Sequence, residues 1–197
     1  MVGLGNPGDR YTGTRHNVGF DAVEAFAKKV AGGGPVRLDR LDCRALTGRM
    51  RVGETPVLVA RPQTYMNLSG ESVKGLAAKY EVPAERLVVV LDEVALPVGS
   101  LRIRRSGSSG GQKGLQNILD CFGTIEIPRM RLGVRGENFQ PGEPKDDYVL
   151  SRFSKKERPV IDEAIGTAVE ALEVFVTEGI DAAMNRFNRS PEELPEN

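Results

Sequence analysis

The chain has 197 residues and carries 27 lysine and arginine residues against 27 aspartate and glutamate residues, so its formal net charge is zero. Hydrophobic residues make up 40% of it, which is enough for a packed core and typical of an ordinary globular protein. One histidine and two cysteines exclude a Cys/His zinc site, and no stretch approaches the roughly 18 apolar residues of a membrane-spanning helix.

The first half of the chain predicts strands and helices in alternation. Residues 2–4 end a short strand, and apolar residues recur at helical spacing over 19–30 until the glycines at 32–34 and Pro35 stop the helix. Residues 43–52 alternate like a half-exposed strand and turn at 53–55 into a hairpin partner at 57–60. Ser69 is expected to cap the next helix, and the continuous apolar run 87–91 indicates a strand buried on both faces.

The second half continues the alternation. It predicts a strand at 101–104, a glycine-rich loop at 107–114, a short helix at 115–122, a strand at 131–135 and a long helix over 161–176. The tail at 190–197 is acidic and contains proline, and we expect it to be mobile. The pattern predicts the α/β class, as a single domain of three layers over residues 1–189. Cys43 and Cys121 stand alone, which predicts core residues of a protein in a reducing compartment.

Glycines at positions 3, 5 and 8 match the GxGxxG pattern of dinucleotide-binding loops, but their context does not. Pro7 lies inside the loop, residues 11–15 delay the helix, and the nearest acids fall on that helix instead of ending a strand. A dehydrogenase is therefore a remote alternative. We expect the glycines to form a tight turn after an inner strand, with Asn6 displayed at its tip.

His16 is the one side chain whose ordinary pKa suits acid–base chemistry near neutral pH. It follows the glycine-rich loop at a strand end, where open α/β sheets gather their ligands. Asp92 ends the most buried strand and should reach the same rim, either as a turn residue or as a carboxylate that holds the imidazole in one tautomer. Without a GxSxG motif, water is the expected nucleophile, and the amides of Asn6 and Asn67 can polarise a carbonyl.

A basic segment is hidden in the neutral total. Residues 99–135 hold seven lysines and arginines against two acids, a net charge of +5. Alternation in the strand at 101–104 puts Arg102 and Arg104 on one face, next to a loop whose backbone amides can approach phosphate oxygens. This is either a polyanion-binding surface or a solvated strand face balanced by acids elsewhere, and the charge pattern leaves both open.

Five segments, in order and over nearly the whole chain, closely resemble the bacterial peptidyl-tRNA hydrolase family. They are VGLGNPG with TRHNVG (2–8 and 14–19), RPQTYMNLSG (61–70), LDE with LPVG (91–93 and 96–99), SGGQKGL (109–115) and, more weakly, YVL with RFS (148–150 and 152–154). The resemblance implies a single α/β domain with a twisted mixed β-sheet flanked by helices. It also implies hydrolysis of the ester between a peptide and the 3′ ribose of tRNA, which releases tRNA stranded by aborted translation.

The resemblance also assigns roles to individual residues. His16 matches the general base that acts on water, Asp92 the residue that orients it, and Asn6 the residue that senses the blocked α-amino group. Positions matching the peptide and 3′-end cleft are Tyr11, Tyr65, Met66, Asn67 and Lys113, and tRNA phosphates are expected at Arg102, Arg104 and Arg131. The implied partner is peptidyl-tRNA, held by its acceptor arm and 3′ end. No metal, organic cofactor, membrane or obligate protein partner is expected, and the protein is expected to be a cytoplasmic monomer.

Three departures from the family pattern bear on these roles. Gln112 and Lys113 stand where many members have His-Asn, and a lysine cannot accept the hydrogen bonds that an asparagine can. The usual Asp-Leu-Asp-Leu-Pro run reads EVALP over 93–97, with one acid fewer. Members normally have a few more apolar residues before Gly3, so we expect the native start to lie upstream.

The main alternative is a non-catalytic RNA-binding relative of the same fold. Such a protein would keep a basic surface and lose the ester chemistry. Retention of Asn6, His16, Asn67 and Asp92 favours the enzyme.

Overall fold

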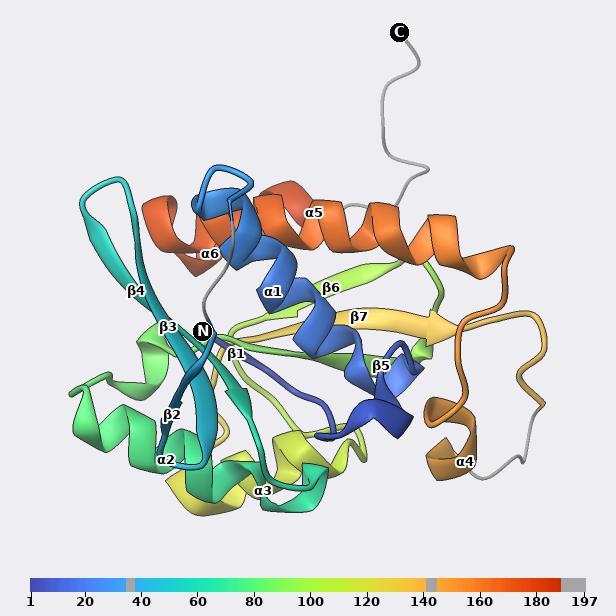
Figure 1. The fold of residues 1–197 in the computed structure, drawn as a ribbon, viewed down its shortest axis with the longest axis horizontal. Helices are drawn as coiled ribbons and strands as arrows, with labels where there is room; N and C mark the ends of the chain where they lie inside the picture. Colours follow the sequence, from blue (N-terminus) through green and yellow to red (C-terminus); the bar gives the residue numbers. More distant parts are fainter. Residues whose placement is uncertain (35–37, 141–144, 189–197) are drawn as a thin grey trace, which may run out of the picture.

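A seven-stranded sheet, in the order β2-β3-β4-β1-β5-β7-β6, runs through the computed structural model, which describes residues 1–34, 38–140 and 145–188 (Figure 1). The strands are β1 (Val2–Gly3), β2 (Arg40–Asp42), β3 (Ala45–Val52), β4 (Thr55–Pro62), β5 (Val89–Pro97), β6 (Leu101–Arg104) and β7 (Arg129–Arg135). The α-helices are α1 (Val18–Val30), α2 (Ser69–Lys79), α3 (Lys113–Phe122), α4 (Lys145–Val149), α5 (Glu157–Glu178) and α6 (Ile180–Phe187). Short 3₁₀ turns are η1 (Asp9–Tyr11), η2 (Arg15–Asn17), η3 (Met66–Leu68) and η4 (Ala84–Arg86). Pro35 and the tail at 190–197 lie outside the described residues.

Both strand orientations occur in this sheet. β1 pairs in parallel with β4 and with β5, and β5 pairs in parallel with β7. β2 with β3, β3 with β4, and β6 with β7 are antiparallel. Parallel neighbours need long crossovers, which the helices supply. Of the antiparallel neighbours, β2 and β3 as well as β3 and β4 follow one another through short turns, whereas α3 lies between β6 and β7 in the chain. The mixed sheet that the resemblance implied is confirmed.

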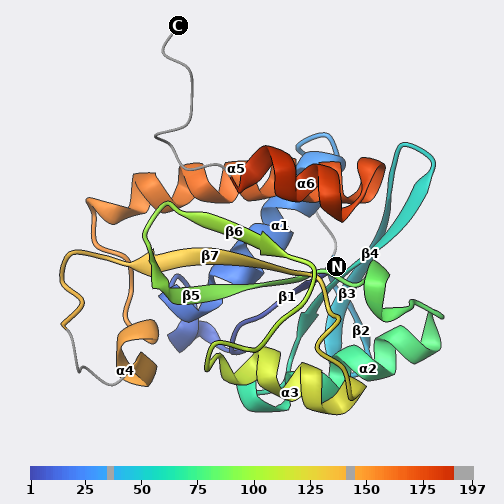
Figure 2. The same ribbon diagram turned by 180° about the vertical axis from the view of Figure 1, so that it is seen from behind.

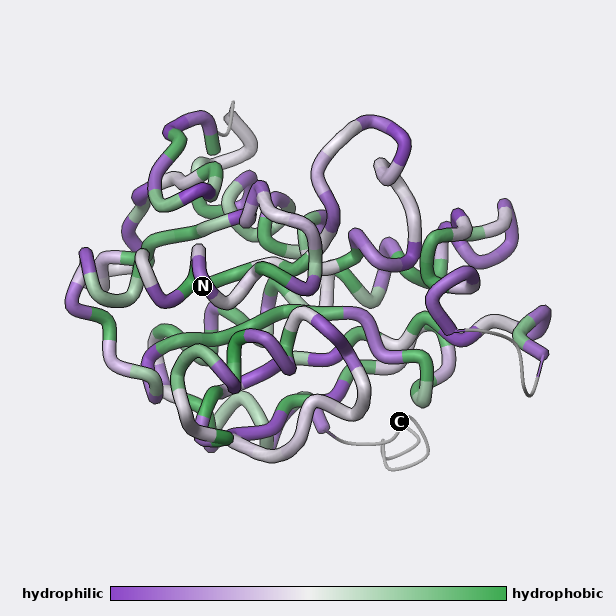
Figure 3. The backbone as a smooth tube through the Cα atoms, turned by 90° about the horizontal axis from the view of Figure 1, so that it is seen from below, coloured by the Kyte–Doolittle hydropathy of each residue, from purple (hydrophilic) through white to green (hydrophobic). Residues whose placement is uncertain are grey.

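Helices cover both faces of the sheet, which confirms the three-layer prediction. α1, α5 and α6 lie on one face, and α2 and α3 lie on the other (Figures 1 and 2). Each face has its own apolar cluster, with Phe26 and Ile161 buried in one and Leu4 and Leu115 in the other. Hydrophobic residues follow the central strands while hydrophilic residues gather toward the periphery (Figure 3). α4 lies apart from both layers, in contact with β5 and η2.

The central strand extends further than its apolar run indicates. β5 continues to Pro97, whereas the sequence predicted that the strand ends at Asp92. Its second half, which begins with Asp92 and Glu93, stays paired with β7, with an irregularity in the register before Pro97. On its other side, β1 stops at Gly3, which pairs with Val90. Asp92 therefore lies inside β5 but just past the end of β1, and this is what places it at the rim of the sheet.

The edge hairpin contains a turn that the sequence did not signal. β2 meets β3 through Cys43 and Arg44, both at positive φ (45° and 59°), so the strand predicted over 43–52 begins at Ala45. Non-glycine residues rarely adopt these angles, and the segment has no Asn-Gly or Gly-Gly pair to announce them. Cys43 and Cys121 are both half-buried free thiols, so the prediction that they are core residues is wrong.

Several boundaries also differ from prediction. Ser69 is the first residue of α2 instead of its cap, since its hydroxyl donates back to the Met66 carbonyl oxygen at 2.9 Å. β7 begins at Arg129, two residues early, and α5 begins at Glu157, before the periodic apolar residues start. The sequence missed β2, α4 and α6, which have too few residues for a clear period to emerge.

Glycine allows α1 to pack directly on β1. A Cβ at Gly3 would lie 2.2 Å from the Gly19 carbonyl oxygen, and a Cβ at Gly19 would lie 2.4 Å from the Val90 carbonyl oxygen. Of the three glycines in the first loop, only Gly8 has a positive φ, of 104°. Gly3 and Gly5 therefore serve the close approach of α1 rather than the tight turn that was predicted. This approach brings the turn before α1, with His16, against the end of β1.

Candidate active site

His16 lies in η2, the single 3₁₀ turn that leads into α1. The residue before it anchors this turn, because the buried Arg15 guanidinium donates to both carboxylate oxygens of Glu157 at 2.9 and 2.8 Å. Its further partners are the Val134 carbonyl oxygen, the Ser151 hydroxyl and the flanking rings of Tyr148 and Phe153. Burial alone would raise the pKa of Glu157, but hydrogen bonds from Arg15 and Ser154 hold that pKa below its usual value. The motif contained Arg15, but no spacing signal pointed to partners so far along the chain.

The imidazole of His16 contacts the carboxylate of Asp92. His16 Nδ1 lies 2.9 Å from Asp92 Oδ2, and the two side chains are 12% and 3% exposed. Because a carboxylate accepts, the contact favours the proton on Nδ1 and leaves Nε2 as the basic nitrogen of the neutral ring. Burial lowers the pKa of His16, but the charge and hydrogen bond of Asp92 outweigh it, and the pKa stands above its ordinary value. One carboxylate thus sets both the orientation and the proton affinity of this base.

The second oxygen of Asp92 has a partner that the predicted site residues did not include. Gln112 Nε2 donates to Asp92 Oδ1 at 3.1 Å. Gln112 is the N-cap residue of α3, and its Oε1 accepts from the Leu115 backbone N–H at 2.7 Å. The resemblance had drawn attention to positions 112 and 113, but the sequence could not tell which of the two side chains faces the carboxylate.

Asn6 is held from two directions. Its backbone N–H donates to Asn17 Oδ1 at 2.8 Å, and its carbonyl oxygen accepts from Asn17 Nδ2 at 3.0 Å. Its side-chain Oδ1 accepts from the Met66 N–H at 2.9 Å, so Nδ2 is the atom left to meet a bound molecule. Asn6 is only 9% exposed, and the expectation that it stands at the tip of a turn is wrong. It joins the first loop to η3 instead.

Met66 in η3 is buried, whereas the residues directly before and after it are exposed. Met66 is 4% exposed and packs its side chain into the core on the α2 and α3 face. Its neighbours Tyr65 and Asn67 are exposed, Tyr65 at 56%. The backbone of Met66 thus fixes Asn6, while the side chains on either side of it are open to a ligand.

Tyr11 and Lys113 each contact a charged neighbour. The guanidinium of Arg10 lies 4.5 Å from the centre of the Tyr11 ring. Lys113, the first residue of α3, forms an ion pair with Asp146 of α4. Asp146 raises the pKa of His16 and Lys113 lowers it, so this ion pair lies within electrostatic reach of the imidazole.

Arginines on β6 and β7 face one another across the strands. Arg102 is directly opposite Arg131, and Arg104 is opposite Arg129. The Arg131 guanidinium lies 3.3 Å from the Glu93 carboxylate and donates to the Ser108 carbonyl oxygen at 2.8 Å. Arg129 is fully buried and donates to backbone carbonyl oxygens. Arg104 is exposed and pairs with no acid in the described part of the chain, and the buried Nε atoms of Arg102 and Arg131 have no hydrogen-bond partner there.

The family model for peptidyl-tRNA hydrolase matches residues 1–195. The chain belongs to the peptidyl-tRNA hydrolase family. It is 44% identical over 189 residues to the peptidyl-tRNA hydrolase of Desulforamulus reducens, covering 96% of this chain and 88% of that protein, and 43% identical over 188 residues to that of Alkaliphilus metalliredigens, covering 95% and 98%. It is similar to the crystal structure of peptidyl-tRNA hydrolase from Acinetobacter baumannii, with a TM-score of 0.84, 31% identity and coverage of 95% and 92%.

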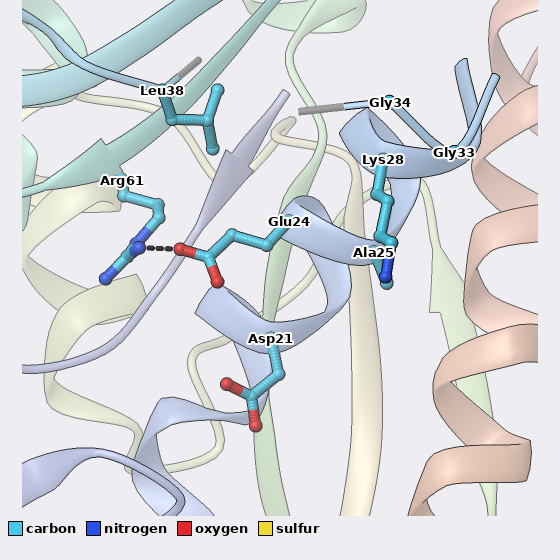
Figure 4. Close-up of a pocket in the computed structure, with 8 residues that line it drawn as sticks. All are labelled: Asp21, Glu24, Ala25, Lys28, Gly33, Gly34, Leu38 and Arg61. Carbon is cyan, nitrogen blue, oxygen red and sulfur yellow. Dashed lines mark ion pairs between the residues drawn. The ribbon is translucent and has the colours of Figure 1, made fainter. Parts of the chain in front are cut away.

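Two hollows of this peptidyl-tRNA hydrolase family member lie away from His16. One, of about 670 Å³, lies beside α1, where Figure 4 shows Glu24 paired with Arg61. The other, of about 910 Å³, is lined by Val2 at the start of β1 and by Val88 directly before β5. Asp92 lies further along β5, beyond the Gly3–Val90 pair at which β1 ends. Neither hollow is lined by a residue of the His16–Asp92 site.

No three His, Cys, Asp or Glu side chains in residues 1–34, 38–140 and 145–188 are grouped as metal ligands would be. None of the helices in those ranges combines the length and the apolar character that crossing a bilayer requires.

Proposed function

We propose that this chain hydrolyses peptidyl-tRNA at the ester between the peptide and the 3′ ribose, with His16 as the general base that acts on water. The observation that supports this most strongly is the contact between His16 and Asp92 in a member of the peptidyl-tRNA hydrolase family. The contact supplies an oriented base with a free nitrogen, which is what water-mediated ester hydrolysis needs.

In this mechanism, Nε2 of neutral His16 takes a proton from water while the water oxygen attacks the ester carbonyl carbon. The tetrahedral intermediate then expels the 3′ oxygen of the ribose, which receives the proton back from the imidazolium. Asp92 stabilises the positive charge that the ring carries between these two steps. A positioned base contributes roughly 10²–10⁴-fold to the reaction rate. Because the alkoxide of an ester leaves more readily than an amine, water activated by the base can attack the ester directly, without an acyl-enzyme.

The side-chain amides of Asn6 and Asn67 donate hydrogen bonds to the negative charge that develops on the ester oxygen and to the peptide. Because Asn6 Oδ1 accepts from Met66, Nδ2 remains as the donor that this side chain can offer to a bound molecule. Asn67 is exposed nearby in η3 and offers a second amide. Tyr11 and Tyr65 present partly open rings for the peptide and the 3′ end, while Lys113 contributes a cation at the start of α3.

We assign the tRNA acceptor arm to the arginines of β6 and β7. Like charges directly opposite each other destabilise a sheet, and a phosphate between Arg102, Arg104 and Arg131 would relieve that repulsion. Arg104 is exposed and pairs with no acid in the described part of the chain, so its guanidinium is free to meet a phosphate. Contacts of this kind position a nucleic acid without reading its bases.

Release of peptide from N-blocked aminoacyl-tRNA tests the proposal. The wild-type protein should release the peptide and leave the unblocked aminoacyl-tRNA largely intact, while His16→Ala should lose at least ~100-fold in kcat. Equal activity of the two proteins would remove His16 as the base. Tight tRNA binding by a wild-type protein that releases no peptide would favour the non-catalytic RNA-binding alternative.

We further propose that residues 1–189 act as one domain and that the protein works in the cytoplasm as a monomer. The residues assigned to base, amides and phosphate surface all come from one chain. Sedimentation across the concentrations used in the activity assay tests the monomer, and a concentration-dependent mass that tracks activity would contradict it.

A further inference from the structure

We infer that Gln112 is a positioning residue of the reaction proposed above, which holds the Asp92 carboxylate in the orientation that fixes His16. Gln112 Nε2 donates to Asp92 Oδ1 at 3.1 Å, and Asp92 Oδ2 lies 2.9 Å from His16 Nδ1. Asp92 is 3% exposed, so one oxygen of a buried carboxylate is committed to the amide and the other to the imidazole. The kinetic consequences rest on the proposed function, whereas the spectroscopic ones do not.

Only one orientation of the Gln112 amide satisfies its surroundings. Oε1 accepts from the Leu115 N–H at 2.7 Å, so the amino group faces Asp92, and Met66 Sδ lies 3.3 Å from the same nitrogen. A flipped amide would set its oxygen against the carboxylate and its amino group against an N–H donor. All the polar atoms of this side chain are therefore in use, and a rotation would lose every one of these contacts.

These contacts close a ring around the candidate site. Its members, in order, are His16, Asp92, Gln112, Met66, Asn6 and Asn17, and Asn17 directly follows His16 in the chain. Gln112 is the member that ties α3 to this ring, because the others come from η2, β5, η3 and the first loop. Without it, Asp92 has one fixed oxygen instead of two and can turn about its side-chain bond.

Glutamine suits this position because it donates a hydrogen bond without bringing a charge. The charged groups that act on His16 are Asp92 on β5, Lys113 on α3 and Asp146 on α4, and the last two are paired with each other. A glutamate at 112 would put an acceptor against an acceptor and add a carboxylate to this balance. The added charge would raise the proton affinity of the imidazole and reduce the fraction of neutral base at pH 7.

Three single variants separate positioning from helix capping. Gln112→Asn keeps a favourable N-cap residue, but its side chain is one methylene shorter and cannot span the distance to Asp92. Gln112→Glu keeps the acceptor for the Leu115 N–H and removes the donor. Gln116→Glu makes the same chemical change one turn later, on an exposed side chain whose partners are Ser109 and Asp120, and serves as the matched control.

Kinetics and NMR read out the effect. We expect Gln112→Asn to lower kcat about tenfold with KM and the melting temperature little changed, and Gln112→Glu to lower kcat at pH 7 about 100-fold. The NMR pKa of the imidazole, which belongs to His16 because the chain has one histidine, should rise by about one unit in Gln112→Glu. The resonance of the hydrogen-bonded Nδ1 proton should broaden in Gln112→Asn, and Gln116→Glu should match wild type throughout.

Wild-type kcat together with a sharp Nδ1 proton resonance in Gln112→Asn would overturn the inference and leave Gln112 as a cap alone. A kcat loss that the Gln116→Glu control shares would overturn it as well. If the wild-type protein releases no peptide, the proposed function fails by itself. The Nδ1 resonance then still decides the role of Gln112, since it needs no substrate.

Discussion

Asn6 and Asn17 hold each other through two hydrogen bonds, from the Asn6 N–H to Asn17 Oδ1 at 2.8 Å and from Asn17 Nδ2 to the Asn6 carbonyl oxygen at 3.0 Å. Both residues are buried, and Asn17 follows His16. The backbone of the first loop is thereby tied to the turn that carries the imidazole, so these two segments hold a fixed position relative to each other.

Asn17→Ala should reduce both stability and turnover. The variant leaves the buried N–H and carbonyl of Asn6 without partners, which costs about 2 kcal/mol, and it frees the turn under His16, so we expect kcat to fall at least ~10-fold. Asn117→Ala is the matched control, because it removes another asparagine acceptor, for the Gly70 N–H at 2.7 Å, away from the base. Urea unfolding and peptide release measure the two effects. A similar loss of kcat in both variants would contradict a specific role for Asn17.

The pH dependence of peptide release should follow His16. Only the neutral imidazole accepts a proton, and its pKa is raised because Asp92 outweighs burial, so the acid limb of kcat/KM should have its midpoint above about 6.5. In Asp92→Asn the attraction is gone while burial remains, so the midpoint should move below that value, and kcat at pH 8 should fall at least ~100-fold. NMR titration of the single histidine gives the same pKa without substrate. A wild-type midpoint at or below 6.5 would be inconsistent with the His16–Asp92 contact acting in solution.

The same contact makes stability depend on pH. The folded pKa of His16 exceeds its unfolded value, so protonation contributes stability that is fully present below about pH 6.5 and is lost as the pH rises through the folded pKa. Urea unfolding of wild type and Asp92→Asn from pH 5 to 9 measures this contribution. We expect the wild-type loss across this range to be absent from the variant.

Glu157→Gln should destabilise the protein at neutral pH. It leaves the buried Arg15 guanidinium without its carboxylate, a loss of about 3 kcal/mol. The lowered pKa of Glu157 means that its contribution is present above the unfolded value and disappears as the pH falls through the folded one, so the variant should lose less stability on acidification than wild type. Glu173→Gln breaks the exposed pair with Lys29 and should cost less than about 1 kcal/mol. Equal costs for the two variants would show that the Arg15 pair is not an anchor.

Arg104→Ala should raise KM and weaken its dependence on salt. Each phosphate contact removed lowers the slope of log KM against log salt by about one, while kcat should stay within about twofold. Arg86→Ala, an exposed arginine of η4 at the amino end of β5, removes the same charge and should change neither quantity. Indistinguishable slopes of log KM against log salt for the two variants would contradict tRNA binding at the β6–β7 surface.

Regular hydrophobic patterns in the sequence predicted most of the strands and helices. The apolar run at 87–91 and the helical periods of α1 and α5 reflect burial against a sheet, which the spacing of residues reports directly. The sequence did not predict the Cys43–Arg44 turn, because its positive φ angles are imposed by the pairing of β2 with β3 and not by residues that prefer them. Local propensity cannot reveal an angle that tertiary pairing enforces.

The candidate site likewise contains residues that the sequence could bring together and one that it could not assign. His16 and Asp92 could be brought together from sequence because strand ends meet at one rim, and in the structure their side chains are in contact. Gln112 could not be assigned, since its side chain points back from a helix start to a strand, and neither element fixes that direction alone. The family resemblance pointed to positions 112 and 113, whereas the contact of the Gln112 amide with Asp92 depends on how α3 packs against β5.

The anchor of η2 also constrains when the site can form during synthesis. Arg15 precedes its carboxylate partner by 142 positions, so this anchor of the turn bearing His16 cannot form until residue 157 has left the ribosome. Most of the chain must therefore be synthesised before the turn that carries His16 gains its buried ion pair.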